Sequence, residues 1–504
     1  NPCRLRSASS SLAEGTINIM SKIKITITLI FLIFALGAYD ILSDSFSLFG
    51  KNSYKGTHIK NKIKSTIFYV PSRIKRATEL EKINLTLREE KKNSTESILT
   101  LYNYSKKVSS FKLSKKKKET ILSNNNIKYQ ITYYDLPLLN YYNSMNKPVG
   151  YIEKYKDKIL LLSGDGQLFF FNEKEIGDSN ITLKRIKSNI NTFDFFNSID
   201  QVGDISIRDI EINNNNFFFS TIYKNNEDCY NLQIYKANLE NIDQLEFKIF
   251  YNMKECLNPK DYKEFNIGQS GGRIIFVGES LIFSTGAFRT RIKSQDDNSY
   301  YGKILEINLN SAEAKILSKG HRNIQGLSVF KNIIISTEHG PFGGDEVNVH
   351  KNLLNNEIVP NYGWPISSYG EHYPPVVQYH KTINNYEKFI EIAPLKKSHK
   401  DFGFIEPIKY FAPGSVGISE IEFSNSNFDS NFSNDIYFGA LRNNLSQYAK
   451  IYHLKFNDDF DKIIYQDEIA INKRIRDLKI PNDDNNMLLM LETTPTLGIL
   501  TKIN

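Results

Sequence analysis

The chain has 504 residues, of which 40% are hydrophobic and 24% charged, and its formal net charge is +8. This composition is typical of a globular protein, and the length allows one large domain with extra segments or two to three ordinary domains. The lysine runs that make the chain basic concentrate before residue 120, and neither a zinc-ligand spacing nor an RNA-binding signature occurs. The charge therefore does not indicate a nucleic-acid partner.

The first 49 residues have the pattern of a targeting segment. Residues 1–19 precede Met20 and show no structural pattern, so we expect them to be a leader outside the fold. Within residues 20–49, the fifteen residues 25–39 are uncharged and follow two lysines. This pattern is typical of a signal peptide. If the apolar run continues to residue 42 it would instead be an uncleaved anchor, somewhat short of the usual ~20 residues. We favour the anchor over residues 25–42, and with it a periplasmic or extracytoplasmic location at the inner membrane.

Residues 50–127 are polar and rich in lysine, and they include the run Ser114–Lys118. Such a composition predicts a solvated spacer or a loosely helical stalk. A weaker alternative is that these lysines rest on anionic lipid beside the membrane.

From residue 128 to 504 the sequence changes to short apolar strands separated by Gly, Asn and Asp turns. Similar strands recur at intervals of 58, 64, 52, 103 and 51 residues, and most are followed by a partner strand. Their first residues are Ile159, Phe217, Leu281, Ile333, Ile436 and Met487. This repeat predicts an all-β fold, a six-bladed β-propeller with four strands per blade, in preference to an irregular pair of sandwiches. The long interval contains residues 350–410, which we expect to cover one face near the axis.

Cys229 and Cys256 flank two alternating strands that are joined near residues 240–244. The two cysteines are almost equally distant from that turn, so in an antiparallel hairpin they face each other at a distance that suits a disulfide. Two free buried thiols are the alternative. Together with the targeting segment, we favour a disulfide and an oxidising compartment.

The most unusual stretch runs from Gly320 to Tyr369. It reads GHRNIQGL, then a short apolar strand, then TEHGPFGGDEVNV, and then NYGWPISSYG, and it holds the only Trp of the chain. Glycine gives access to unusual backbone angles, and proline removes a donor and leaves carbonyl groups free. A loop that exposes carbonyl oxygens and is followed by Asp345 and Glu346 suits a hard cation such as Ca²⁺.

The blocks GHRN-x-QG, EHGP-x-GGDE-x-N and YGWP-x-x-SYG resemble those of the quinoprotein glucose/sorbosone dehydrogenase family. Members of that family are six-bladed β-propellers that bind pyrroloquinoline quinone (PQQ) and Ca²⁺ and oxidise sugars. The resemblance covers about residues 130–504 and is densest in residues 268–442. It implies oxidation of an aldose or polyol, with a small-molecule sugar as substrate and a respiratory electron acceptor as partner.

The resemblance also assigns cofactor-binding residues. Asn323 and His339 match positions that contact PQQ, Arg442 stands where the family usually has a cofactor-binding Lys, and Arg474 and Arg476 match the paired arginines of the family. Residues i and i+2 of a strand project to the same side, so the two guanidinium groups of that pair should point one way. Guanidinium groups suit the carboxylates of PQQ.

Three further positions carry over from the family. Gly340 and Pro341 match the residues whose carbonyl groups bind the Ca²⁺ that bridges to the cofactor. Arg322 matches a position near the reacting oxygen and could polarise a substrate.

The expected catalytic pair is missing. Where the family has a catalytic His in an HxGGR block this chain has Gln269, and where the family has an assisting Asp it has Ala287. A glutamine amide cannot act as a general base, and loss of such a base typically costs a factor of about 10²–10⁴ in rate. His321, His339 and His372 remain as conceivable bases, of which His321 has more the character of a structural residue and His372, on the inserted segment, could overhang the site.

This departure supports an alternative function. A propeller without the catalytic pair could serve as a catalytically inactive binding or scaffold module of the cell envelope. The retained arginines and the Gly-rich loop argue against that reading. A hydrolase or lactonase would need acidic residues and a His clustered at the axis, and the sequence offers no distinct set of these.

Overall fold

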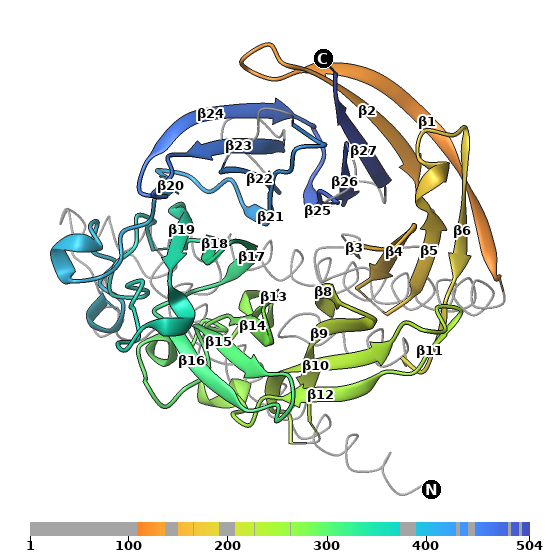
Figure 1. Ribbon diagram of the computed structural model, residues 1–504. Helices are drawn as coiled ribbons and strands as arrows, with labels where there is room; N and C mark the ends of the chain where they lie inside the picture. The colour runs from red at the N-terminus through yellow and green to blue at the C-terminus, as the bar shows by residue number, and fades with distance from the viewer. Residues whose placement is uncertain are drawn as a thin grey trace, which may run out of the picture. The chain divides into compact units, whose positions relative to one another are not determined.

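The computed structural model describes residues 108–136, 150–164, 166–190, 207–225, 227–262, 264–372, 390–429, 434–441, 449–481, 485–492 and 496–503 (Figure 1). The predicted leader and the predicted signal or anchor segment lie outside the described residues. All described strands belong to one unit, Ser105–Asn504. Among the described helices none is long and apolar enough to cross a membrane.

The described strands form six four-stranded antiparallel blades around a common axis (Figure 1). Blade 1 contains β3 (Gly150–Tyr155), β4 (Lys158–Ser163), β5 (Leu168–Asn172) and β6 (Asn180–Arg185). Blade 2 contains β8 (Ile207–Asn213), β9 (Asn216–Lys224), β10 (Tyr230–Asn238) and β12 (Lys248–Asn252). Blade 3 contains β13 (Gly271–Val277), β14 (Ser280–Thr285), β15 (Lys303–Asn308) and β16 (Ala314–Lys319).

The other three blades repeat this order, with the first strand innermost. Blade 4 contains β17 (Ile324–Phe330), β18 (Ile333–Glu338), β19 (Asp345–Lys351) and β20 (Lys409–Phe411). Blade 5 contains β21 (Ile418–Phe423), β22 (Asp435–Ala440), β23 (Lys450–Phe456) and β24 (Ile463–Ala470). Blade 6 contains β25 (Ile475–Lys479), β26 (Asn486–Leu491), β27 (Thr496–Lys502) and, as its fourth strand, β2 (Lys128–Asp135).

The ring closes between the two ends of the propeller sequence, because β2 completes the last blade. Beyond it, β1 (Ser110–Leu122) pairs with β2 through residues 115–122 and with β6 of blade 1 through residues 110–114. Blades 6 and 1 are therefore one nine-stranded sheet, spanned on its outside by β1 (orange in Figure 1).

This strand corrects the predicted spacer, which was expected to extend to residue 127. Residues 110–122, including the lysine run, belong to the propeller. Of the side chains in β1, only Leu113 is fully buried, so the strand has the composition of a solvated segment although its backbone is paired. Lysines on an outer strand also discourage edge-to-edge association.

The predicted repeat is confirmed. All six predicted strand starts fall in the second strands of the blades, which are β4, β9, β14, β18, β22 and β26. These strands are apolar on both faces because each blade packs between two neighbours. Six separate clusters of buried apolar side chains fill the spaces between adjacent blades, and the inner strands contact one another in a closed ring. The long interval is an insertion between the third and fourth strands of blade 4.

The remaining elements are short. A two-residue parallel pair joins β7 (Lys187–Ser188) and β11 (Gln244–Leu245). Single-turn 3₁₀ helices are η2 (Glu173–Glu175), η3 (Pro259–Asp261), η4 (Ile267–Gln269), η5 (Ile292–Ser294), η6 (Leu353–Asn355) and η8 (Lys400–Phe402).

Cys229 and Cys256 form a disulfide, with their Cα atoms 5.6 Å apart. They lie just beyond the paired part of β10 and β12, where Gln233 faces Asn252. This is the hairpin arrangement that the spacing of the two cysteines predicts. The bond holds the open end of the outer hairpin of blade 2.

Candidate active site

The motif residues gather at one end of the propeller axis. The inner strands of the blades run in the same direction, so their first residues share one end of the ring. Residue 271 begins β13, residue 324 begins β17 and residue 475 begins β25. The GGR block (residues 271–273), the GHRN block (320–323) and the RIRD block (474–477), which are far apart in the sequence, therefore meet there.

Asn323 and His339 lie side by side at this end of blade 4. The His339 amide donates to the Asn323 carbonyl at 3.1 Å, and Asn323 Nδ2 lies 3.5 Å from His339 Nδ1. Asn323 Oδ1 accepts from the amide of Gly271 at 3.1 Å, which ties blade 4 to blade 3. Burial lowers the pKa of His339 to about 4, and the guanidinium groups of Arg322 and Arg476 act in the same direction. The imidazole is therefore neutral at pH 7.

One buried carboxylate holds both arginines of the RIRD block. Glu492 accepts from Arg474 Nε at 2.9 Å and from Arg476 Nε at 2.5 Å. Arg476 Nη1 also donates to Gln325 Oε1 at 3.4 Å, and Gln325 Nε2 donates to Asn323 Oδ1 at 3.1 Å. A continuous hydrogen-bonded network thus joins blade 6 to blade 4 across the end of the axis.

Glu492 is ionised in this arrangement. Its burial raises the pKa of the carboxyl, but the charges of Arg476 and Arg474 outweigh burial and bring the pKa below its ordinary value. The two guanidinium groups share this one carboxylate, so the cluster keeps a positive charge.

Hydrogen bonds to the carboxylate of Asp345 anchor the loop after β18. This buried carboxylate accepts from the Gly340 amide at 3.0 Å, the Ser415 hydroxyl at 2.7 Å and the Gly417 amide at 2.6 Å. A Cβ on Gly340 would lie 2.2 Å from the Gly343 carbonyl oxygen, so only glycine fits there. Among the described residues no donor bonds the carbonyl oxygens of Gly340 or Pro341. Both oxygens are therefore able to bind a cation.

Gln269 and Ala287 occupy adjoining turns of blade 3. The Phe288 amide donates to the Gln269 carbonyl at 2.9 Å, and the Ala287 amide donates to the Arg322 carbonyl at 2.8 Å. Gln269 is 8% exposed, and its Oε1 atom is enclosed without a hydrogen-bond partner among the described residues. The position where a catalytic His was sought therefore lies close to Arg322, but it carries an amide.

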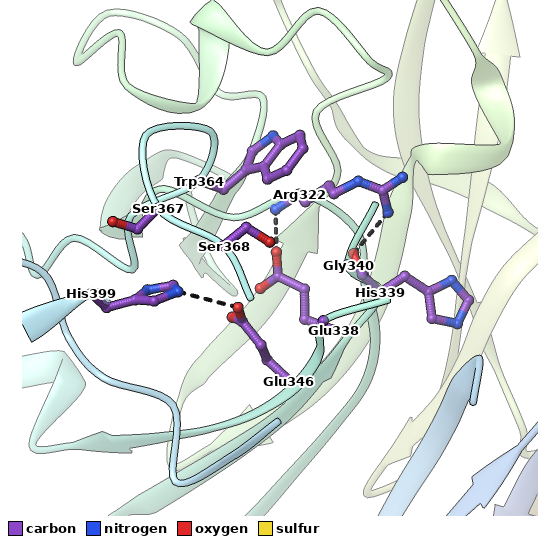
Figure 2. Close-up of a pocket in the computed structure, with 10 residues that line it drawn as sticks. Arg322, Glu338, His339, Gly340, Glu346, Trp364, Ser367, Ser368 and His399 are labelled. Atoms are coloured by element: carbon purple, nitrogen blue, oxygen red, sulfur yellow. Dashed lines mark hydrogen bonds and ion pairs between the residues drawn. The ribbon is translucent and has the colours of Figure 1, made fainter. Parts of the chain in front are cut away.

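A cavity lies beside Arg322, between the loop after β18 and the inserted segment of blade 4 (Figure 2). Arg322 Nη1 donates to the His339 carbonyl at 2.7 Å, and the guanidinium lies 5.3 Å from the centre of the Trp364 ring. The residues that line the cavity are Arg322, Glu338, His339, Gly340, Gly344, Glu346, Trp364, Ser367, Ser368 and His399.

Sequence reasoning missed His399, which lines this cavity. Its Nε2 lies 3.3 Å from Glu346 Oε1 (Figure 2). Its Nδ1 lies 2.9 Å from the Tyr362 carbonyl. Burial raises the pKa of Glu346, while in His399 the lowering effect of burial is outweighed by Glu346 and the pKa is raised. The contact between the two side chains fixes the inserted segment to β19.

The other conceivable bases have different places. His321 is fully buried, with Nδ1 3.0 Å from Glu338 Oε2 and Nε2 2.8 Å from Ser318 Oγ, so it is a structural residue. His372 is half-buried and is not among the residues that line the cavity. Arg442 lies outside the described residues.

Gln325 and Glu492 were also missed. Gln325 is the glutamine of the GHRN-x-QG block, and Glu492 directly follows the apolar strand β26. A carboxylate immediately after an apolar strand was the available signal, since a buried carboxylate needs a cationic partner.

The fold and the site define a class of protein, a six-bladed propeller with an arginine-rich site at one end of its axis. The Glucose / Sorbosone dehydrogenase family matches residues 164–497, and the chain belongs to this family. Aldose sugar dehydrogenase YliI of Escherichia coli (strain K12) is 27% identical over 252 residues, which is 46% of this chain and 59% of that protein. Uncharacterized protein slr1608 of Synechocystis sp. (strain ATCC 27184 / PCC 6803 / Kazusa) is 27% identical over 227 residues, which is 40% of this chain and 48% of that protein. The matched segments thus span about half of each relative.

Solved structures give the same fold. The soluble aldose sugar dehydrogenase of Escherichia coli in its apo-form superposes with a TM-score of 0.54 at 18% identity, over 74% of this chain and all of that one. A glucose dehydrogenase structure has a TM-score of 0.54 at 18% identity, over 74% of this chain and 99% of that one. These likenesses establish the propeller architecture.

Proposed function

We propose that this chain is a PQQ-dependent sugar dehydrogenase that oxidises a hydroxyl group of an aldose or polyol with the assistance of Ca²⁺. The observation that carries the proposal is the arginine pair on Glu492. Arg474 and Arg476 share one carboxylate and extend through Gln325 to Asn323. A preorganised cluster of guanidinium groups suits a flat tricarboxylate.

Two further observations fit a ligand at this end of the axis. Gln269 Oε1 and His339 Nε2 are enclosed polar atoms without partners among the described residues. Enclosed polar groups normally have hydrogen-bond partners, so atoms without them point to a bound group. The carbonyl oxygens of Gly340 and Pro341 would hold the Ca²⁺, since this ion prefers oxygen ligands.

When bound at this site, PQQ would supply the acceptor for the hydride that leaves the sugar carbon. Arg474, Arg476 and Asn323 bind and orient it, and Arg322 polarises the reacting hydroxyl oxygen. Neutral His339 can accept a hydrogen bond at Nε2, because its pKa lies well below 7. Gln269 can accept a hydrogen bond from a substrate hydroxyl at Oε1, although it cannot take up the proton.

A titration of the full-length chain with PQQ tests the proposal, with Ca²⁺ in one arm and a chelator in the other. We expect saturable binding that requires Ca²⁺, followed by oxidation of a sugar with a dye acceptor. In that assay Gln269→His restores the base and should raise turnover by a factor of about 10²–10⁴. If the chain binds no PQQ with or without Ca²⁺, the proposal fails.

The second candidate is a catalytically inactive propeller that serves as a binding or scaffold module of the cell envelope. Gln269 and Ala287 favour it, because neither side chain can accept a proton at neutral pH. In that case the motif residues are architectural, and PQQ would not bind.

We further propose an extracytoplasmic location, with electrons passing to a respiratory acceptor and the membrane contacted through residues 25–42. The disulfide between Cys229 and Cys256 supports an oxidising compartment.

A further inference from the structure

Trp364, the only tryptophan of the chain, lies in the wall of the cavity that Figure 2 shows. Its side chain is 5% exposed and packs against Ala287 and Leu395. Its backbone is fixed as well, since the Trp364 amide donates to the Gly320 carbonyl at 3.0 Å and the Trp364 carbonyl accepts from Gln295 Nε2 at 2.6 Å. The indole ring is therefore held in one place against blade 3.

The guanidinium of Arg322 lies over this ring. Its central carbon is 5.3 Å from the ring centre, and its Nη1 donates to the His339 carbonyl at 2.7 Å. An aromatic face attracts a cation that lies within about 6 Å of the ring centre. The backbone of Arg322 is anchored too, because the Ala287 amide donates to the Arg322 carbonyl at 2.8 Å. The ring and the His339 carbonyl thus determine where the charge of Arg322 lies.

A second guanidinium group contacts the same ring. The central carbon of Arg291 is 5.5 Å from the ring centre of Trp364, and Arg291 Nε pairs with Glu264 Oε2 at 2.7 Å. The enclosed Trp364 Nε1 makes no hydrogen bond within the described residues. Among these contacts the tryptophan side chain therefore acts through its ring.

A ring holds a guanidinium group differently from a carboxylate. The two arginines of the RIRD block share the carboxylate of Glu492, which cancels part of their charge. An aromatic ring attracts the cation through its quadrupole and carries no opposite charge. For a group that polarises an oxygen atom, the ring is the better support, because the positive charge remains effective.

The two carboxylates that line the cavity are engaged by histidines. Glu338 Oε2 lies 3.0 Å from His321 Nδ1, and Glu338 Oε1 accepts from the backbone amide of Arg322. Glu346 Oε1 lies 3.3 Å from His399 Nε2. These contacts hold the carboxylates in place on the far side of the cavity wall from which Trp364 contacts the guanidinium group.

We propose that Trp364 is a positioning residue for the reaction, because its ring holds the guanidinium of Arg322 where that group polarises the reacting hydroxyl oxygen. This inference rests on the proposed function, in which Arg322 has that role. Trp364 has no part in binding PQQ in this proposal, since the arginines of blade 6 bind it. Loss of the ring should therefore lower turnover and leave the affinity for PQQ unchanged.

The contact itself is testable without the cofactor, because all tryptophan fluorescence of the full-length chain comes from Trp364. We would measure quenching by acrylamide in the wild-type chain, in Arg322→Ala and in Arg322→Lys. Arg322→Ala uncovers the ring and should raise the quenching constant, and Arg322→Lys should give an intermediate value because it keeps a cation. Lys116→Ala, at an exposed position of β1, is the control and should match the wild type. Wild-type quenching in Arg322→Ala would overturn the contact.

The consequence for the reaction is measured with PQQ, Ca²⁺, glucose and a dye acceptor. Trp364→Leu should lower kcat by about two- to thirtyfold, the range of a cation–π contact, with KM and the affinity for PQQ unchanged. Trp364→Phe keeps an aromatic face and should retain most of the turnover. In a chain that already carries Arg322→Ala, Trp364→Leu should have no further effect, because both residues act through one contact. Phe402→Leu, at an exposed aromatic position of the same inserted segment, is the matched control and should leave kcat unchanged.

Three results would overturn the positioning role. Equal losses in Trp364→Phe and Trp364→Leu would mean that the indole N–H acts in place of the ring. A parallel loss of kcat and PQQ affinity would mean that Trp364 only supports the fold. A full additional loss from Trp364→Leu in the Arg322→Ala chain would mean that the two residues act independently.

Failure of the proposed function is distinguishable from these results. If the wild-type chain binds no PQQ or oxidises no sugar, the proposed dehydrogenase fails, and with it the role of Trp364 in that reaction. The quenching experiment still shows whether the ring and the guanidinium group are in contact. It leaves Trp364 in place, so it does not depend on the folding of Trp364→Leu, which circular dichroism checks.

Discussion

Arg273 of blade 3 and Asp477 of blade 6 lie 204 residues apart in the sequence, and Arg273 Nη1 is 3.4 Å from Asp477 Oδ1 on the propeller axis. The same guanidinium pairs with Asp209 of blade 2 at 2.9 Å and with Glu420 of blade 5. One buried arginine thus binds carboxylates from three other blades. The arginine of the GGR block and the aspartate of the RIRD block are therefore architectural residues.

A second layer of charge lies two residues further along the inner strands. Lys479 Nζ is 2.8 Å from Glu153 Oε2, 3.0 Å from Glu422 Oε1 and 3.7 Å from Glu211 Oε2. The two layers arise from the alternation of a strand, because residues i and i+2 face the same side. Six carboxylates around two cations leave the axis with more acidic than basic groups.

We expect Arg273→Leu to destabilise the propeller strongly. The substitution leaves Asp209, Glu420 and Asp477 buried near one another without their shared cation, and breaking a buried pair in this way typically costs about 3–5 kcal/mol. Denaturant unfolding followed by circular dichroism measures the change. Lys116→Leu on β1 is the control, because its ion pair with Asp135 is exposed, and it should change the free energy of unfolding by less than about 1 kcal/mol. Equal effects of the two substitutions would contradict the structural role of the axial arginine.

The axial carboxylates predict a pH dependence of stability. Burial raises the pKa of Asp477 to about 7, against an ordinary value of 3.8, and it raises the pKa of Asp209 and Glu420 in the same direction. A raised carboxyl pKa means that the folded state binds the proton more tightly, so stability from this source is lost as pH rises from about 4 to about 7.

Asp477→Asn should reduce that pH dependence, since an amide does not titrate. Thermal unfolding at half-unit pH steps measures it. Asp157→Asn is the control, because the exposed carboxyl of Asp157 has a lowered pKa through Lys158 and contributes with the opposite sign. An unchanged profile in Asp477→Asn would show that this carboxyl does not hold the proton.

The double change Arg474→Ala and Arg476→Ala should abolish PQQ binding while the propeller remains folded. Glu492 loses both partners, so some stability is lost as well, and circular dichroism must show that the fold persists. Glu492→Gln is the matched variant, because it keeps both guanidinium groups but removes the carboxylate that orients them. We expect it to weaken PQQ binding by about tenfold or more, through lost preorganisation. Normal PQQ affinity in the double variant would exclude this cluster as the cofactor site.

The disulfide predicts that an alkylating reagent labels neither Cys229 nor Cys256 in the native protein before reduction. After reduction both should react, and the free energy of unfolding should fall by about 2–5 kcal/mol. Peptide mapping by mass spectrometry distinguishes these two from Cys3. Prompt labelling before reduction would contradict both the bond and the proposed oxidising compartment.

The sequence predicted the blades well because each blade is a local unit. A strand that packs between two neighbours is a short apolar run, and its partner follows within a few residues, so the repeat is visible without tertiary information. The same locality predicted the hairpin that joins Cys229 to Cys256. The outer strand β1 escaped prediction because most of its side chains face solvent, and its composition resembles that of a solvated linker.

The motif blocks led to part of the candidate site and missed the rest. Asn323, His339, Arg474 and Arg476 were recognised by type and spacing, and the structure brings them into one network. Gln325, Glu492 and His399 were not, because their roles depend on contacts that only the folded chain reveals: Gln325 with Arg476, Glu492 with both arginines of the pair, and His399 with the cavity.

The sequence by itself determined the fold class and the family, since these depend on residue types at local spacings, and it predicted that the usual catalytic pair is missing. Only the tertiary structure decided that Arg273 and Asp477 hold the axis together and that Arg474 and Arg476 share Glu492. The reason is physical. The role of a charged side chain depends on the groups that it contacts. In a propeller those groups come from different blades, which meet only when the ring closes.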